Sequence, residues 1–294
     1  MNNIATFNQP ANLDPFGLSG SIVDFPIKSE KGNLPHFHHK KAVYAVEDDG
    51  EILRGLGIVG RDYPVTAHVD FFERQHDMLA RKLPQQHVEK AETKYSLARD
   101  GAFAKQDITF PSIRVPIETY KHKTDIGLRY IAWHGVDGLT SNNGIFGAID
   151  FLCSNGMITG EYDVVRKKNT KNFSLAAFVD EVELSVDNFY EQHRVYQSWA
   201  ARRISGQQVK ELFEAFPVSK RKARELLAVY HTEAAVRGET LWTVYSTLTN
   251  YSSHTNNGFE LRQTGGDHAA HTMLKREFEV SKLVNSEPFQ QLAA

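Results

Sequence analysis

The first half of the chain alternates apolar and polar residues with the period of two that is typical of β-strands. The run KAVYAVE starts at Lys41, Asp48-Asp49-Gly50 is a hairpin-turn signal, and EILRGLGIV continues after it. The apolar run at 145–152 fits a buried strand or a short helix equally well, because both tolerate a run of this length. Further strand-like runs, the first two separated by the turn signal Asp100-Gly101, cover residues 89–99, 102–110, 114–120 and 126–134.

One helix interrupts these strands, and helical periodicity takes over after residue 173. Thr66 is a suitable N-cap, and the segment after it has an apolar face at helical spacing as far as Leu83. From Ser174 an amphipathic stripe extends to Arg202-Arg203 and predicts one long helix. The remaining predicted helices start at Ser205 and, after the break at Pro217, at Ser219, and cover 241–251 and 273–284.

These elements predict an α+β fold: a mostly antiparallel β-sheet with one helix, followed by a C-terminal helical region packed on it. Residues 1–40 are rich in Asn, Pro, Gly and Ser, and we expect an irregular N-terminal arm there. Residues 41–173 form the β-rich part and 174–294 the helical region. Because the boundary is a change of period without a linker, both parts are expected to share one core.

Composition narrows the class of protein. The 294 residues carry a net charge of −2, so any nucleic-acid surface must be a local patch. The single cysteine allows no internal disulfide and no cysteine-based zinc site, which fits a reducing compartment. The first residues lack a signal-peptide pattern, and no apolar run approaches the roughly 18–20 residues of a membrane span. We therefore expect a soluble protein of the cytoplasm.

The sequence shows no recognisable catalytic or cofactor motif. Gly55, Gly57 and Gly60 spell G-x-G-x-x-G, but they lie in a predicted strand, and Arg61-Asp62-Tyr63-Pro64 blocks the helix start that a dinucleotide site needs. P-loop, nucleophile-elbow and H-E-x-x-H motifs do not occur. We expect no cofactor, no metal and no enzymatic activity, although the loop from His134 to Asn143 leaves a site built from Asn and His side chains open.

Two further candidates for chemistry have simpler explanations. Positions 68, 70 and 77 cannot share one helix face with 76, so His68, Asp70, His76 and Asp77 are interpreted as a solvated face, not a metal cluster. Cys153 follows apolar neighbours that would raise a thiol pKa, and we interpret it as a core residue rather than a nucleophile.

A cationic helix start is the first candidate binding segment. The positive end of a helix dipole disfavours cations by about 0.3–1 kcal/mol each, so a cluster there suggests that it faces an anion such as phosphate. The alternative is an exposed, hydrated turn in which the cost is small. The residues concerned, in the first turn of the helix predicted after Ser219, are Lys220, Arg221, Lys222 and Arg224.

A basic strand end interleaved with aromatic residues is the second candidate. Proteins that bind single strands use this mixture, because cations follow the phosphates while rings stack on bases. The alternative is a solvated end of a strand. The segment consists of the cations Arg166, Lys167, Lys168 and Lys171 and the rings Tyr162 and Phe173.

The central run HGVDGLTSNNGIFGAIDFLCSNGMITGE resembles the signature of a phage- and plasmid-borne family known as domain of unknown function 932. That signature is an Asp-Gly turn, an apolar segment, and C-x-N-G followed by an aliphatic residue. Asp150 departs from it, because family members commonly carry an arginine there, so no role of that arginine is carried over. The matching residues are Asp137, Gly138, Cys153, Asn155, Gly156 and Met157.

Other segments extend the resemblance over about 43–280. Residues 57–73 are similar to a family segment that leads into an acidic helix, and 241–251 to its L-W-x-x-Y helix. The setting of the family implies a role in nucleic-acid metabolism. By fold-level analogy, it implies a single-strand annealing protein with a curved sheet, packed helices, a basic groove and an oligomeric ring.

Two hypotheses of different class follow. The first is a non-enzymatic protein of phage or mobile-element origin that binds and anneals single-stranded DNA in recombination or replication, as a homo-oligomer. The alternative is a protein-interaction module aimed at a host factor, with an exposed apolar patch near Phe213, Phe216 and Trp242. The turns Asp137-Gly138 and Asn155-Gly156 are expected to bracket one buried segment at the centre of the fold.

Overall fold

The structure is a computed structural model of the whole chain. It describes residues 22–26, 39–46, 51–150, 155–157, 164–167, 174–183, 188–253 and 269–294.

The described elements form two antiparallel sheets and a set of helices, which confirms the predicted α+β class. The strands are β1 (Ile22–Pro26), β2 (Lys40–Val46), β3 (Ile52–Gly60), β4 (Glu92–Ala98), β5 (Phe103–Glu118), β6 (Lys123–Gly135), β7 (Asn142–Asp150), β8 (Asn155–Met157) and β9 (Val164–Lys167). The helices are α1 (His68–Lys82), α2 (Gln85–Val88), α3 (Leu175–Glu183), α4 (Asn188–Ala201), α5 (Gly206–Ala215), α6 (Lys220–Arg237), α7 (Leu241–Ser253), α8 (Ala269–Val284) and α9 (Glu287–Ala293).

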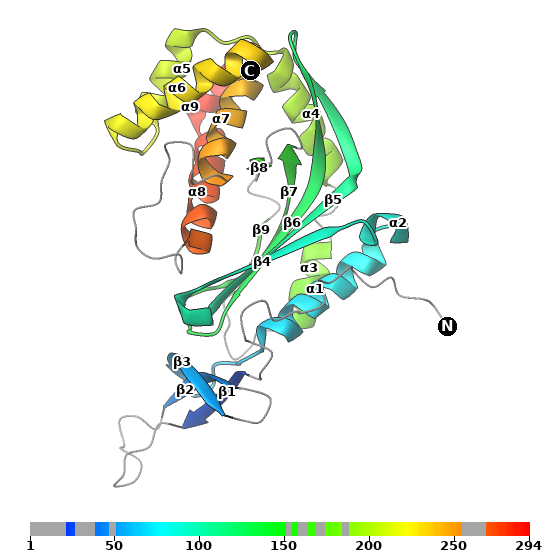
Figure 1. Cartoon of the computed structure of the whole chain (residues 1–294), viewed down its shortest axis with the longest axis vertical. Coiled ribbons are helices and arrows are strands. Elements are labelled where there is room, and N and C mark those ends of the chain that lie inside the picture. Colours follow the sequence, from blue (N-terminus) through cyan, green and yellow to red (C-terminus); the bar gives the residue numbers. More distant parts are fainter. Residues whose placement is uncertain are drawn as a thin grey trace.

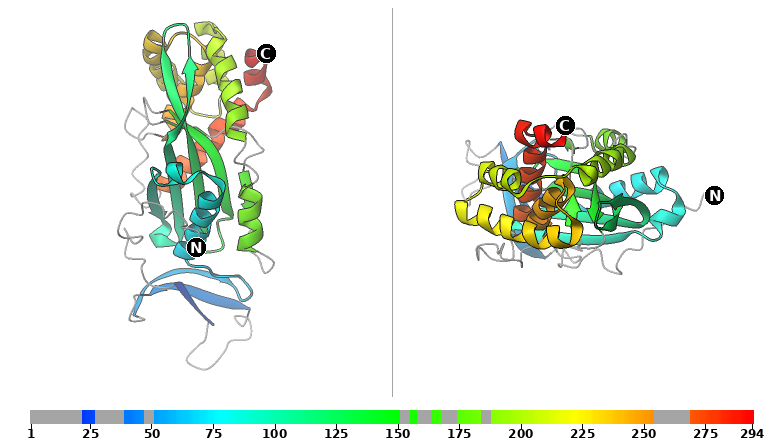
Figure 2. Two further views of the ribbon diagram at one scale, coloured as in Figure 1. Left: turned by 90° about the vertical axis from the view of Figure 1, so that its right-hand side faces the viewer. Right: turned by 90° about the horizontal axis from the view of Figure 1, so that it is seen from above.

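The molecule is elongated, with a long twisted sheet along its axis (Figure 1). The small sheet β1-β2-β3 lies at one end, and the helices α5, α6 and α7 gather around the other. Seen from the side, the small sheet lies beyond one end of the main sheet, whereas α1 and α3 flank the main sheet (Figure 2). The predicted helical region therefore packs on the sheet.

The large sheet has the strand order β4-β5-β6-β7-β8, and β9 also pairs with β7. The apolar run at 145–152, which fitted a strand or a helix, contributes to β7. Asn155 and Gly156, expected to form a turn, instead pair with Asp150 and Ile149 as part of β8. The central turn Asp137-Gly138 is confirmed, because Gly138 has a φ of 77° and the Leu139 N–H donates to Asp137 Oδ1 at 2.9 Å.

The hairpin β5–β6 is the longest pairing in this sheet. Its register runs from Phe103 opposite Gly135 to Glu118 opposite Lys123, with a shift between Phe110 and Arg114. Extra residues on one strand of an antiparallel pair bend the strand and increase its twist. The hairpin thus leaves the plane of the sheet and reaches the helical end of the molecule (Figure 1).

One face of the large sheet packs against α1 and α3. Tyr130 and Phe146 contact each other on that face, with ring centroids 4.7 Å apart, and Phe71 of α1 lies 5.6 Å from Phe178 of α3. Tyr130 is wholly buried, and its hydroxyl donates to the Gln75 side chain. Alternation along the strands therefore builds an apolar layer in which the polar atoms still find partners.

The opposite face carries a buried row of charges that α8 covers. Arg129 Nε donates to Asp107 Oδ1 at 2.8 Å, Lys105 Nζ lies 3.3 Å from Asp107 Oδ2, and Arg129 Nη2 lies 3.2 Å from Glu277 Oε1. Burial alone would raise the pKa of Asp107, but Arg129 and Lys105 hold it below its usual value. The buried row between the sheet and α8 therefore contains two cations and two carboxylates, whose charges cancel.

A second buried ion pair joins the sheet to α6. Asp150, at the end of β7, is 0% exposed and accepts from Arg237 Nη1 at 2.7 Å and from Thr124 Oγ1 at 2.8 Å. Arg237 Nε also lies 3.9 Å from Glu233 Oε2. The position at which the sequence departs from its family pattern therefore holds the carboxylate that pairs with the C-terminal end of α6.

The helical region differs from its prediction in one respect. The expected single helix from Ser174 to Arg202 is two helices, because α3 ends at Glu183 and α4 begins at Asn188. The predicted starts at Ser205 and Ser219 are confirmed, since the Ser205 side chain forms a capping box and the Ser219 side chain accepts from the Lys222 N–H.

The segment at 241–251 forms α7, which is buried on nearly every side. Helix α7 supplies Trp242 and Tyr245 to an aromatic cluster with Tyr196 and Trp199 of α4, in which the ring centroids lie 5.2–5.8 Å apart. Because α4, α6 and α8 all pack on α7, the helical layer depends on it.

The N-terminal half requires two corrections. The segment expected to be an irregular arm includes β1, which pairs with β2 from Ile22 opposite Ala45 to Pro26 opposite Lys41. Helix α1 begins after Ala67, and no side chain caps it, so Thr66 is not its N-cap. The turn expected at 48–50 lies outside the described residues.

The three glycines of the G-x-G-x-x-G run lie in β3, as predicted. No helix starts among them, although a dinucleotide site would need one. Gly57 has a packing role, because a Cβ there would come within 2.9 Å of the Asp137 Cα. Close by, the Tyr63 hydroxyl donates to Gly135 O at 2.9 Å and Arg99 Nε lies 3.2 Å from Asp137 Oδ2. The small sheet therefore contacts the β6–β7 turn of the large sheet.

Candidate anion-binding site between α5 and α6

The cationic helix start predicted from the sequence is the first turn of α6. Ser219 satisfies one of its amides, since its Oγ accepts from the Lys222 N–H at 3.2 Å. The other N–H groups of a first turn have no partner within their own helix and are available to an anion. The predicted residues Lys220, Arg221 and Arg224 are exposed, and Lys222 is half-buried.

Two of these four cations are neutralised locally. Lys222 Nζ lies 2.7 Å and Arg221 Nε 2.9 Å from the carboxylate of Glu225, one turn further along α6. The hydrogen bond from Lys222, followed by that from Arg221, lowers the pKa of Glu225. Arg221 and Lys222 therefore contribute less positive potential to the helix start than their number suggests.

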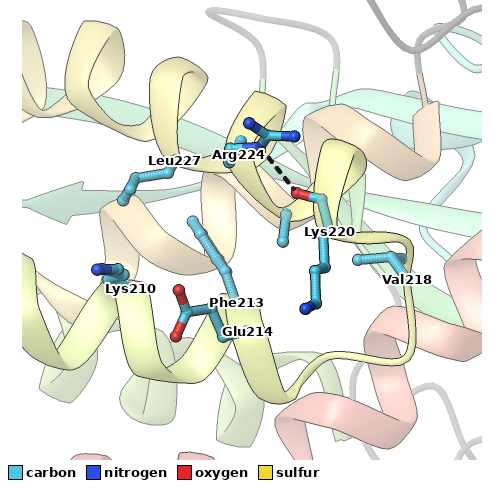
Figure 3. Close-up of a pocket in the computed structure, with 8 residues that line it drawn as sticks. Lys210, Phe213, Glu214, Val218, Lys220, Arg224 and Leu227 are labelled. Carbon is cyan, nitrogen blue, oxygen red and sulfur yellow. Dashed lines mark hydrogen bonds between the residues drawn. The ribbon is translucent and has the colours of Figure 1, made fainter.

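The other two cations, Lys220 and Arg224, line a cavity of about 560 Å³ between α5 and α6. Lys210 and Glu214 line it from α5, and Lys220 and Arg224 from α6, where Arg224 Nε also lies 3.4 Å from Lys220 O (Figure 3). The lining therefore contains three cations and one carboxylate, and its other residues are apolar. The apolar residues of the lining are Phe213, Val218, Ala223 and Leu227.

Local sequence explains why the two helices meet in this way. The capping box at Ser205 starts α5, and Pro217 lies in the short connection before Ser219 starts α6. Phe213 of α5 then packs edge-on against Tyr230 of α6, with ring centroids 6.4 Å apart. The cavity opens where this contact ends, toward the N-terminal turn of α6.

A site of this kind suits an anion that also carries a flat or apolar part. The ammonium of Lys220, the guanidinium of Arg224 and the free amides of the first turn favour a phosphate or carboxylate. The apolar lining favours a group that leaves water, such as a nucleobase or an aliphatic chain. Sequence reasoning missed Lys210, because only the packing of α5 on α6 brings it to the site.

The second predicted segment is described only in part. Arg166 and Lys167 lie in β9, opposite Asn143 and Asn142 of β7. The remaining predicted residues of this segment, Tyr162, Lys168, Lys171 and Phe173, lie outside the described residues.

The described strand of the second segment lies away from α6. β9 pairs with the first four residues of β7, whereas β8 pairs with its last three. Helix α7, on which α6 packs, contacts β8. The backbone of β9 and helix α6 are therefore associated with opposite ends of β7 (Figure 1).

The histidines that raised the question of catalysis or metal binding are buried, so the expectation of a solvated face is wrong for His68 and His76. His68 Nε2 lies 2.8 Å from Gly101 O, and His68 Nδ1 lies 2.8 Å from His134 Nδ1. His68 Nε2–H therefore donates to Gly101, and its Nδ1 accepts from His134. Burial lowers the pKa of His68 to about 4. Burial and the neighbouring His68 together lower the pKa of His134 well below its usual value.

His76 is held in a similar way on α1. Its Nε2 contacts the Gln106 side chain, which donates to the Tyr95 hydroxyl at 2.9 Å. Burial lowers the pKa of His76 to about 4. Within the described part of the chain, no three His, Cys, Asp or Glu side chains form a group suited to a metal ion. Cys153 lies outside the described residues.

The patch that motivated the protein-interaction hypothesis is not at the surface. Phe213, Phe216 and Trp242 are each at most 2% exposed, so they form core rather than an exposed apolar patch. Among the helices that the structure describes, none has the length and apolar character that crossing a bilayer requires.

Comparison with known proteins identifies a family but no function. No curated protein and no solved structure matches the chain. Residues 55–277 match the family described as "Domain of unknown function (DUF932)", which spans β3 to α8 and includes both α5 and α6. With most of its length covered by that match, the chain belongs to this family.

Proposed function

We propose that this protein binds single-stranded nucleic acid, most specifically single-stranded DNA during recombination or replication of a phage or mobile element. The observation that carries the proposal is the cavity between α5 and α6. It combines cations, the amide groups of a helix N-terminus and an apolar lining within one site of about 560 Å³.

The chemistry of the lining supports a single strand over a duplex. In a single strand, a phosphate and an unstacked base lie close together, and each requires a different environment. Lys220 and Arg224 provide the charge for the phosphate, while the partly exposed Val218 and Leu227 provide apolar surface for the base. A duplex keeps its bases stacked and would use only the cations.

Binding of this kind is expected to depend on salt and to be nearly indifferent to base sequence. Each phosphate that a cation neutralises in a single strand contributes about 0.7 to the slope of log K against log salt concentration. The test is fluorescence anisotropy of a labelled oligothymidine, titrated at about 50 mM and about 200 mM salt. Absence of binding at micromolar protein and low salt would refute the proposal.

Charge reversal separates the site from general electrostatics. The variant Lys220→Glu/Arg224→Glu is expected to bind at least about tenfold more weakly, a loss of about 1.4 kcal/mol, and to lower the salt slope by roughly 1.4. The matched control is Lys90→Glu/Lys94→Glu, which changes the net charge equally at two exposed lysines near β4. Equal weakening in both variants would place the binding elsewhere.

Annealing requires two strands to be held together, so the proposal includes self-association of the protein. The solution mass with and without oligonucleotide tests this part. A larger assembly in the presence of a single strand supports annealing, and a monomer of unchanged mass limits the function to binding.

A further inference from the structure

The tip of the β5–β6 hairpin carries an exposed tyrosine between cations. Tyr120 is 48% exposed, although large aromatic side chains are usually covered. The guanidinium of Arg203, from the connection between α4 and α5, lies 4.2 Å from its ring centroid, and Lys121 Nζ lies 5.9 Å from it. A strand and a helical connection that are distant in sequence thus meet around one ring.

This tip is rigid. The Thr119 hydroxyl accepts from the N–H groups of Lys121 at 3.3 Å and His122 at 3.0 Å, and the Thr119 N–H donates to His122 O at 2.8 Å. The same hydroxyl contacts the carbonyl of Arg237. The turn is therefore closed on itself and attached to the end of α6.

The ring of Tyr120 is held at its edge. Its hydroxyl accepts from the Glu239 N–H at 3.0 Å, and a Cβ on Gly238 would come within 2.7 Å of the ring. A side chain fixed at the hydroxyl loses little further freedom when a ligand stacks on it. Tyr120 is thus a preorganised aromatic surface.

Positive charge predominates around this surface. Lys121, Lys123 and Arg203 are exposed, and in the described part of the chain none of them pairs with a carboxylate. Two exposed carboxylates lie nearby in sequence: Glu118 comes directly before the tip, and Glu239 directly after Gly238. Cations beside a preorganised ring are the combination on which single strands bind.

The tip and the α5–α6 cavity lie at opposite ends of the same helix. The N-terminal turn of α6 borders the cavity, while Arg237, its last residue, contacts the hairpin tip. The 18 residues of α6 span roughly 27 Å at 1.5 Å per residue. At the roughly 3.4 Å per nucleotide of a stacked strand, about eight nucleotides cover this distance, and an extended, unstacked strand needs fewer.

We propose that the hairpin tip, with Tyr120 and Arg203 flanked by Lys121 and Lys123, is a second contact for the same single strand that occupies the α5–α6 cavity. This inference rests on the proposed function. A base stacks on the exposed part of the Tyr120–Arg203 pair, and the two lysines neutralise the phosphates beside it. The strand then follows α6 from one end to the other.

Oligonucleotide length provides the test. An oligothymidine of about four nucleotides reaches one site only, and one of about twelve reaches both, given the span of α6. Anisotropy titrations at low salt compare the unmodified protein, Lys121→Glu/Lys123→Glu, and the control Lys90→Glu/Lys94→Glu. All four lysines are exposed or flank a turn, so the substitutions leave the core intact.

The hairpin variant is expected to bind the long oligonucleotide about tenfold more weakly than the unmodified protein, and the short one equally well. Equal affinity of the two proteins for the long oligonucleotide overturns the inference while the proposed function stands. An equal loss for both lengths also overturns it, because the lysines would then act through general charge. If the unmodified protein binds neither length, the proposed function and the inference fall together.

Discussion

Replacing Arg237 with methionine tests whether the buried ion pair joins the sheet to the helical layer. The substitution keeps most of the side-chain stem but removes the cation from Asp150, which is 0% exposed. The hydrogen bond from Thr124 Oγ1, at 2.8 Å, stays in place but supplies no positive charge to that carboxylate. Removing one partner of a buried pair typically costs about 3–5 kcal/mol, because a charge is left in a site without water.

We therefore expect Arg237→Met to lower the free energy of unfolding by about 3–5 kcal/mol. For a domain of this size the melting temperature would fall by roughly 6–20 °C. Urea unfolding followed by circular dichroism measures the free energy, and differential scanning calorimetry the melting temperature.

The double variant Arg237→Met/Asp150→Leu serves as the control. Apolar replacement of both partners of a buried pair is often nearly neutral, so the double variant should be more stable than Arg237→Met alone. Burial already raises the pKa of Glu233, so this second neighbour of Arg237 can take up a proton when the cation is lost. A loss below about 1 kcal/mol in Arg237→Met, or a double variant no more stable than it, would refute the reasoning.

Two further predictions concern pH and packing. Because burial lowers the pKa of His68 and His76 from 6.5 to about 4, the unfolded chain binds more protons than the folded one between these values, so stability falls as pH decreases from 6.5 toward 4. Protonation of each histidine should lower the free energy of unfolding by about 2 kcal/mol between pH 7.5 and pH 5, as measured by urea unfolding. A His76→Gln variant should show a shallower dependence on pH, and a flat profile of the unmodified protein would contradict the buried neutral state of the histidines. Gly57→Ala should lower the stability by about 1–3 kcal/mol, because the new Cβ would lie 2.9 Å from the Asp137 Cα. Gly60→Ala, where a Cβ would meet nothing within 4 Å, should be nearly neutral in thermal unfolding. Equal effects of the two substitutions would show that β3 does not pack on the turn.

The sequence predicted those features that depend on neighbouring residues. The starts of α5 and α6 follow from Ser205 and Ser219, whose side chains accept from amides three residues away. The turn at Asp137-Gly138 follows from the tolerance of glycine for positive φ. The α+β class follows from the change of period near residue 173.

Features that depend on distant residues could not be predicted in the same way. His68 and His76 were assigned to a solvated face because polar residues on a helix usually face water. They are buried because His134 and Gln106 of the sheet supply hydrogen-bond partners, and such partners leave no periodic signal in the sequence. Lys210 entered the candidate site for a similar reason, through the packing of two helices.

The charged row between the large sheet and α8 has a consequence for the order in which the protein is made. Glu277 follows Arg129 by 148 positions, so at about 5–20 residues per second the ribosome needs roughly 7–30 s to supply this carboxylate. During that interval Asp107 is the only counter-ion of Lys105 and Arg129 on this face among the residues that the structure describes, and an unbalanced charge keeps its water. The first face of the sheet can close over its apolar layer while the nascent chain is still growing, but the second face stays hydrated until α8 has been synthesised.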